Sequence, residues 1–254
     1  MSLRNIWTIG KRDFKSYFTS PVAYIIIAGF LMIMGWMFFG ILNHFTDMGQ
    51  QQMGMGKGMS IAEGIIRPLY QNMNVIFLFV IPFITMRLFA EEKKLHTLEL
   101  LMTAPVTLLD IVLGKFFSAF CLIGVMLLAT AIYPFLLVVN GNPEWGPILT
   151  NYLGIFLIAS CYLSLGLLFS ATTENQIIAT SLTFFSILFM WILPWASAFV
   201  GPFWGDVLVY LSLIAHFNNF SQGLLNSTDV IYYLTFTAGG LFLTHRVLDS
   251  YRWR

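Results

Sequence analysis

The sequence predicts an all-α polytopic membrane protein, and three observations lead to that fold class. Of its 254 residues, 58% are hydrophobic and only 10% are charged, whereas a typical soluble domain carries about 25% charged residues. Several uncharged runs reach the roughly 18 residues that a membrane-spanning helix requires. Glycine, proline or polar residues separate these runs, and the intervals between them are too short for a soluble catalytic domain. We therefore expect residues 1–254 to form a single transmembrane domain.

Apolar length and turn residues predict six membrane-spanning helices. They cover residues 21–42, 69–89, 109–139, 147–170, 176–197 and 230–248. The first run is longer than the apolar region of a signal peptide, so we expect it to remain as a span. The third would extend for about 50 Å as one helix, beyond a hydrocarbon core of about 30 Å. We expect it to start at a capping box formed by Thr107 and Asp110 and to bend near Pro134.

The basic residues predict the orientation of these spans. Eleven of the 13 Lys and Arg residues lie before the first span, between the second and third spans, or after the sixth. Since positively charged segments are retained on the cytoplasmic side, both termini should be cytoplasmic. Residues 43–68, 140–146 and 198–229 should then face outward.

Residues 1–18 are predicted to form an amphipathic helix ahead of the first span. Leu3, Trp7, Gly10, Phe14 and Phe18 recur at helical spacing, and basic residues occupy the other side. A helix of this kind lies at the membrane interface, so we expect it on the inner leaflet. Two interpretations stay open, a lipid anchor and a packing element beside a partner subunit.

The outer segment 43–68 is rich in glycine, glutamine and methionine. Its thioethers belong to Met48, Met53, Met55 and Met59, and thioethers are soft ligands that could hold Cu(I). A mobile loop with no metal explains the same composition more simply. No metal site is therefore assigned there, and copper binding is kept as a hypothesis.

The outer segment 198–229 contains glycine and proline breaks followed by an apolar stretch at 207–220. That stretch is too short to cross a bilayer and too apolar for a free loop. We expect a re-entrant or interfacial helical hairpin, since helix satisfies the backbone at membrane depth. Trp204 and Tyr210 should then lie at the level of the lipid head groups.

No catalytic or nucleotide-binding pattern is evident. The four histidines are scattered, and Cys121 and Cys161 lie within apolar runs, so metal-ligand spacing is absent. The predicted spans are nearly free of ionisable residues, which disfavours an ion-coupled secondary transporter. A net charge of +1 disfavours a nucleic-acid partner. We expect no enzyme activity, cofactor or metal in this chain, with energy supplied by another polypeptide.

The most informative segment lies between the second and third spans. Leu95, Leu98 and Met102 recur at spacings of three and four, which predicts a short amphipathic helix over 88–103 that ends before Pro105. Its charged residues are expected to face solvent. A solvated end of the second span, with no further role, is the alternative interpretation.

This segment resembles the cytoplasmic signature of the type-2 ABC exporter permeases (ABC-2 family). The pattern reads Arg87-x-x-x-Glu91-Glu92-Lys93-x-x-x-Thr97-x-Glu99-Leu100-Leu101-x-Thr103-x-Pro105-Val106. The resemblance covers essentially the whole chain and implies six spans, an N-terminal interfacial helix, a cytoplasmic coupling helix and an outer helical hairpin. His96 departs from the pattern, because relatives commonly carry glycine there. The helix boundary near Thr97 is therefore open.

Within this family the likeness is closest to the gliding-motility-associated permeases (the F component). The motifs that carry it are His216-Phe217-x-x-Phe220-x-x-Gly223, Asp229-Val230-x-Tyr232-Tyr233 and Arg252-Trp253-Arg254. The nitrous-oxide-reductase maturation permeases are similar as well.

The resemblance implies the permease subunit of an ABC transporter in a bacterial inner membrane, driven by ATP hydrolysed in a separate ATPase. The implied partners are two copies of that ATPase, a second permease subunit, the lipid bilayer and an accessory periplasmic-facing subunit. The implied ATPase-coupling residues are Arg87, Glu91, Glu92, Lys93, Leu95, Thr97, Leu98, Glu99 and Leu101. The residues that mark the outer hairpin are Trp204, His216, Phe217, Phe220 and Gly223.

The resemblance does not fix a substrate, and a lipid- or glycan-linked molecule is one candidate class. Two alternatives stay open. One is a membrane scaffold of a motility or metalloenzyme-maturation complex, and the other is an ATP-independent secondary transporter.

Overall fold

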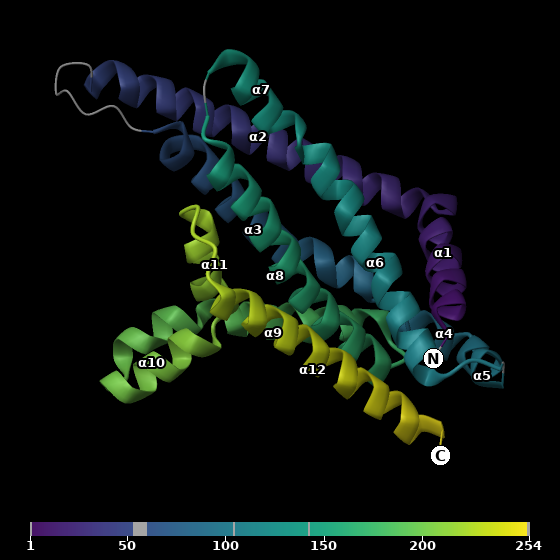
Figure 1. The fold of residues 1–254 in the computed structure, drawn as a ribbon. Helices are drawn as coiled ribbons and strands as arrows, with labels where there is room; N and C mark the ends of the chain where they lie inside the picture. The colour runs from purple at the N-terminus through teal and green to yellow at the C-terminus, as the bar shows by residue number, and fades with distance from the viewer. Residues whose placement is uncertain (1, 53–59, 104, 142, 253–254) are drawn as a thin grey trace.

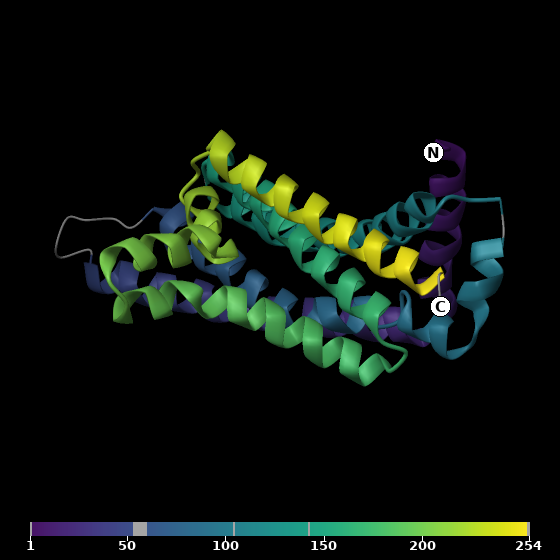
Figure 2. The same ribbon diagram turned by 90° about the horizontal axis from the view of Figure 1, so that it is seen from below.

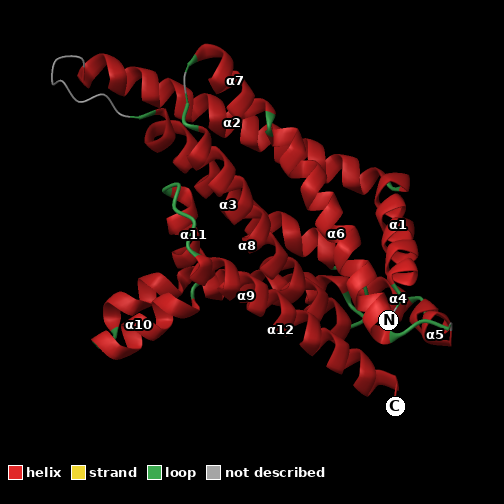
Figure 3. Cartoon of the chain, viewed as in Figure 1, coloured by secondary structure: helices red, strands yellow, loops and turns green. Residues whose placement is uncertain are grey.

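The computed structural model describes residues 2–52, 60–103, 105–141 and 143–252, and within these ranges it contains helices and no strand (Figure 3). The long helices are α2 (Pro21–Gln52), α3 (Arg67–Thr85), α6 (Leu108–Thr130), α8 (Trp145–Thr172), α9 (Gln176–Ala196) and α12 (Ser227–Arg252). The shorter ones are α1 (Leu3–Thr19), α4 (Ala90–Lys94), α5 (Thr97–Thr103), α7 (Ile132–Asn140), α10 (Pro202–Leu211), α11 (Leu213–Ser221), the π-helix η1 (Ala62–Ile66) and the 3-10 helix η2 (Ser197–Phe199). The predicted all-α class is confirmed.

Five stretches of the described chain are long and apolar enough to cross a membrane. They are Pro21–Asp47, Ala62–Lys94, Leu108–Val139, Trp145–Thr172 and Gln176–Phe199. These match the first five predicted spans, although the first two are longer than expected. The predicted sixth span, 230–248, is helical within α12 but is not among the five. The chain is thus a multi-pass helical membrane protein, while a count of six spans stays a prediction.

Helix α8 lies at the centre of the bundle. It packs against α12, α3, α9, α6 and α11. Its residues Ile155, Ile158 and Leu163 have no exposed surface, as expected for a helix enclosed on all sides. By contrast α2 and α9 bury little of themselves, and Trp36 and Phe189 are 75% and 61% exposed. Apolar surface of that extent is stable only against lipid or another subunit.

The two ends of the molecule differ in their elements. The N-terminus, the C-terminus, α1, α4 and α5 lie at one end, and α7, α10 and α11 lie at the other (Figures 1 and 2). Helix α1 runs across the ends of the long helices and packs on α6 of its own chain. Its Ile9 and Gly10 are buried there, whereas Leu3 and Trp7 are exposed. The packing face of α1 is therefore occupied within the chain, and the exposed apolar face is free for lipid.

The third predicted span is divided, as its length required. The Asp110 N–H donates to Thr107 Oγ1 and the Thr107 N–H donates to Asp110 Oδ2, both at 3.2 Å, which confirms the capping box. Helix α6 ends at Thr130 and α7 begins at Ile132. Pro134 has no N–H to offer the Thr130 carbonyl, so the regular ladder fails at this point.

The outer segment forms two short helices rather than one. The extended backbone of Ser212, at ψ 125°, separates α10 from α11, and the Ser212 hydroxyl accepts from the Ala215 N–H at 3.4 Å. The structure has two helices in this segment, and a hairpin that enters the outer leaflet remains a prediction. The copper hypothesis falls largely on residues 53–59, which lie outside the described residues.

Candidate coupling site

The segment after α3 consists of two short helices with a sharp break between them. Helix α4 ends at Lys94, α5 begins at Thr97, and His96 between them has φ 55°. A left-handed residue cannot continue an α-helix, so the prediction of one helix over 88–103 is wrong. The break falls at His96, the residue at which the sequence departs from the signature pattern. His96 takes up the left-handed conformation at a cost that glycine would not incur.

Helix α4 is held by the C-terminal end of α8. Ser170 Oγ accepts hydrogen bonds from the N–H groups of Phe89 and Ala90, at 3.0 and 3.1 Å, and donates to the Met86 carbonyl at 3.2 Å. A side chain of another helix thus satisfies backbone donors that the start of α4 leaves free. The connection from α3 into α4 is therefore fixed in position by α8.

Lys93 adds a second attachment of α4. Its Nζ donates to the carbonyl oxygen of Ala171 near the end of α8 and lies 4.4 Å from the centre of the Tyr251 ring. The side chain is 5% exposed, so the expectation that Lys93 faces solvent is wrong. A cation at a helix C-terminus is stabilised by the free carbonyls of the last turn. Lys93 therefore links α4 to α8 and to α12.

Lys115 of α6 is the centre of an ion-pair network. Its Nζ lies 2.7 Å from Glu92 Oε1 of α4 and 3.2 Å from Asp13 Oδ2 of α1. Arg12 of α1 lies 3.5 Å from the same Glu92 oxygen. The Lys115 side chain is only 3% exposed, so its charge depends on both carboxylates. Glu92 is thus engaged inside the chain, which corrects its predicted exposure to solvent.

The apolar residues that α4 and α5 expose differ from those predicted. Leu98 is 1% exposed and packs within this chain, and Leu101 is partly buried against the same core. Leu95 and Leu100 are 62% and 72% exposed. The face available to another protein is therefore formed by Leu95 and Leu100, beside the exposed Glu99. Thr97 contributes by donating from its hydroxyl to the Glu92 carbonyl at 3.3 Å, across the break.

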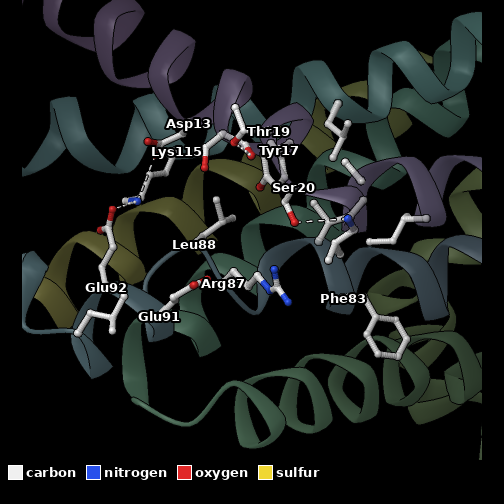
Figure 4. A pocket seen from close by; sticks show the side chains of 17 residues that line it. Asp13, Tyr17, Thr19, Ser20, Phe83, Arg87, Leu88, Glu91, Glu92 and Lys115 are labelled. Carbon is white, nitrogen blue, oxygen red and sulfur yellow. Dashed lines mark hydrogen bonds and ion pairs between the residues drawn. The ribbon is translucent and has the colours of Figure 1, made fainter.

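A pocket of about 420 Å³ lies between α1, α2, α3, α4 and α6 (Figure 4). Arg87 extends into it from the end of α3, and Glu91 and Glu92 line it from α4. Hydroxyl groups of the α1–α2 junction line the opposite wall. These are the hydroxyls of Ser16, Tyr17, Thr19 and Ser20. Of the predicted coupling residues, Arg87 thus points inward rather than toward a partner.

The residues predicted to mark the outer hairpin lie between α8 and the start of α12, with one exception. Phe217 and Phe220 are fully buried, and Gly223 adopts φ 83°, the left-handed conformation that ends α11. His216 Nε2 donates to the Tyr210 carbonyl at 2.9 Å, and its Nδ1 lies 2.6 Å from Asp229 Oδ1. Asn219 donates to the other oxygen of that carboxylate at 2.8 Å. Trp204 lies apart on α10 and is 63% exposed.

Sequence reasoning missed Asp13, Lys115, Ser170 and Asp229 as site residues. Lys115 stands alone within an apolar run, and Asp13 is the single acid in a basic helix. When one of two packed helices carries a single isolated acid and the other a single isolated base, an ion pair between them can be predicted. Ser170 carried no comparable signal, because serine at an apolar helix end is common.

The long apolar helices, the crossing α1 and the ion-paired α4–α5 segment define a multi-pass membrane domain with a structured attachment site at one end. The family model described as ABC-2 family transporter protein matches residues 7–244, and the chain belongs to this family. Comparison with curated proteins gives no match. Membership makes the chain a membrane component of an ABC transporter, which implies an ATPase partner and a lipid bilayer.

Proposed function

We propose that this chain is the permease subunit of a bacterial inner-membrane ABC exporter, with α4 and α5 receiving motion from a separate ATPase. The observation that carries this proposal is the position of Lys115, whose charge joins Glu92 of α4 to Asp13 of α1. If an ATPase displaces α4, then either α1 and α6 move with it or a buried ion pair breaks. Breaking such a pair costs about 3–5 kcal/mol, so joint movement is the favoured outcome.

The proposed docking face for the ATPase is formed by Leu95 and Leu100. Both leucines are exposed on either side of the His96 break, and Glu99 beside them has a side chain that is 66% exposed. An apolar centre with a charged rim is the usual composition of a protein interface. Glu92 and Lys93 of the signature hold α4 against the spans.

The proposed topology has six spans, with both termini cytoplasmic. The placement of α1, α4, α5 and both termini at one end supports it, because most basic residues belong to that end. Helix α12 completes the even number of spans by packing along α8. In a chain lacking Cys121 and Cys161, an impermeant maleimide should label Asn226→Cys in intact cells and should label His96→Cys only after lysis. The reverse result would overturn the orientation.

We further propose an assembly of two permeases and two ATPases, with an accessory periplasmic-facing subunit. The exposed apolar surfaces of α2 and α9 support a second permease, since they are suited to lipid or to another helix. The resemblance at His216, Phe217, Phe220 and Gly223 supports a gliding-motility-associated exporter, for which a lipid- or glycan-linked substrate is the candidate class.

Co-purification with the ABC ATPase encoded beside this chain tests the proposal. The complex should change the rate of ATP hydrolysis, and Leu95→Ser with Leu100→Ser should weaken assembly by about tenfold or more, since two buried leucines are lost from the interface. The matched control is Leu224→Ser with Leu225→Ser, two exposed leucines at the opposite end, which should leave assembly unchanged. An ATPase that neither binds nor responds would favour the membrane scaffold instead.

A further inference from the structure

The lining of the pocket beside Arg87 changes character in a fixed order. Its deepest wall, on the spans, is apolar and comprises Val22, Ala23, Ile26, Phe83 and Ile84. One helical turn beyond Ile84 comes Arg87, and one turn beyond that comes Glu91. Lys115 and Asp13 also line the pocket and pair with each other. Leaving this pair aside, the lining from the spans toward the end of the molecule is apolar, then cationic, then anionic.

Arg87 and Lys115 are the two cations that line this pocket, and of the two only Arg87 has no partner within the described residues. Its guanidinium makes no hydrogen bond or ion pair, and its Nε is buried. A buried donor without an acceptor is destabilising, and for a charged group the penalty is larger. Guanidinium groups present parallel N–H donors that match the oxygens of a phosphate. The free Arg87 therefore fits a phosphate-bearing ligand.

A second donor stands on the opposite wall. The hydroxyl of Tyr17 is buried beside Ser118 without a hydrogen bond of ordinary geometry. Burial, together with the nearby Asp13 charge, raises the pKa of the Tyr17 hydroxyl. The group therefore stays protonated near neutral pH and can donate. Ser20 adds a hydroxyl whose oxygen already accepts from the Val22 N–H at 3.4 Å, which leaves its proton free to donate into the pocket.

The outer part of the pocket presents acceptors. Glu92 Oε2 is buried and has no hydrogen-bond partner, although the other oxygen of this carboxylate pairs with Lys115. The Glu91 side chain lines the same space and makes no hydrogen bond or ion pair in the described structure. Two carboxylates with free oxygens favour a cation that carries N–H donors.

We propose that this pocket binds the head group of a phosphatidylethanolamine-type lipid, drawn from the leaflet on the side of the chain termini. The phosphodiester pairs with Arg87 and the Tyr17 hydroxyl, and the ammonium group donates to Glu91 and Glu92. The glycerol and the first acyl carbons lie on the apolar wall between α2 and α3. The order of the three lining types matches the order of acyl chain, phosphate and ammonium in such a lipid.

The proposal does not depend on ATP-driven transport. It requires only a membrane protein whose pocket opens near the head groups, and an amphipathic helix such as α1, which lines the pocket, favours that position. A soluble phosphoethanolamine ester shares the polar chemistry of the lipid head group. The apolar wall distinguishes the two sources, because only the lipid can cover it.

Lipid binding to the delipidated full chain in detergent tests the proposal, with native mass spectrometry as the readout. Phosphatidylethanolamine should bind about tenfold more tightly than phosphatidylglycerol, which lacks the ammonium, and than phosphatidylcholine, whose quaternary nitrogen has no N–H. Glycerophosphoethanolamine should compete only at far higher concentration. Equal retention of the three lipids would overturn the proposal, and equal competition by the soluble ester would overturn the lipid as its source.

Single substitutions test the cationic and the anionic part of the pocket separately. Arg87→Gln should lower the affinity for phosphatidylethanolamine by about tenfold or more, and Arg87→Lys should recover part of it, because a point charge remains without the paired donors. Glu91→Gln should remove the preference over phosphatidylglycerol while leaving phosphate binding intact. Lys94→Gln, an exposed neighbour that does not line the pocket, is the matched control and should behave as wild type. Unchanged lipid preference in both Arg87→Gln and Glu91→Gln would refute the proposal.

Discussion

Ile9 of α1 packs directly over Gly114 of α6, so closely that a Cβ atom on Gly114 would lie 2.9 Å from the Ile9 Cβ. The same Cβ would lie 3.2 Å from the Ile6 carbonyl oxygen. The crossing of α1 over α6 therefore depends on the missing side chain. Because Asp13, one turn after Ile9, pairs with Lys115, the residue next to Gly114, this crossing also sets the geometry of the ion-pair network.

We expect Gly114→Ala to destabilise the protein by displacing α1. Overpacking costs about 1–3 kcal/mol, and the higher helix propensity of alanine offsets up to about 1 kcal/mol of that. The measurement is thermal unfolding in detergent, together with the rate of proteolysis within residues 3–19. Gly124→Ala is the matched control on α6, since a Cβ there meets nothing closer than Phe156 at 3.9 Å. Equal melting temperatures for the two variants would show that the crossing can relax.

The ion-pair network around Lys115 predicts that substitutions of its members have strongly non-additive effects on stability. Lys115→Met removes the closest partner of Glu92 and leaves the Asp13 carboxylate with Arg12, at 2.8 Å, as its remaining partner. The Lys115→Met substitution should lower the free energy of unfolding by about 2–3 kcal/mol. This is at or below the lower end of the range for a broken buried pair, because Arg12 still reaches Glu92. Adding Glu92→Gln to Lys115→Met should recover part of the loss. A double-mutant cycle on the free energy of unfolding measures this coupling, and additive effects would mean that Lys115 and Glu92 act independently.

The break between α4 and α5 gives a prediction about backbone conformation. His96→Val should reduce stability by about 1–2 kcal/mol relative to His96→Gly, because a β-branched residue is disfavoured at φ 55° whereas glycine is not. Limited proteolysis of the α4–α5 connection reports on this region directly. Lys94→Val, an exposed position in helical α4, serves as the comparison. Equal proteolysis of the His96→Val and His96→Gly proteins would argue against a left-handed residue at this position.

Some elements of the fold could be predicted from the sequence and others could not, for physical reasons. Apolar length located the first five spans, because a bilayer imposes a minimum number of apolar residues on any helix that crosses it. The capping box at Thr107 and the division near Pro134 followed from local chemistry that needs no tertiary information. The single helix over 88–103 was wrong because periodicity averages over a break of two residues, Leu95 and His96.

The functional details depend on contacts that periodicity does not report. The helical pattern of the 88–103 segment alone predicted that Glu92 faces solvent and that Leu98 contacts the ATPase. Glu92 is instead paired with Lys115 of α6 and Arg12 of α1, which are distant in sequence, and Leu98 is buried in the core of the chain. The Ser170 attachment and the free guanidinium of Arg87 likewise appear only when the helices are packed together.

The hydrogen bonds around Asp229 give the last prediction. One carboxylate oxygen accepts from Asn219 Nδ2, and the other faces His216 Nδ1, while the second ring nitrogen of His216 must donate to the Tyr210 carbonyl. Asp229→Asn removes the negative charge, so the contacts with Asn219 and His216 become hydrogen bonds between neutral groups, which are about half as strong as charge-assisted ones. The change should cost on the order of 1 kcal/mol.

We therefore expect Asp229→Asn to loosen the α10–α11 hairpin, measured as faster amide hydrogen exchange over residues 202–221 and a lower melting temperature. Exchange over α4 and α5, at the opposite end of the molecule, should not change. Asp206→Asn is the control, because Asp206 is exposed on α10 and lies outside this cluster. If exchange in the hairpin were unaffected by Asp229→Asn, the buried His216–Asp229 contact would not be what holds α11 to the start of α12.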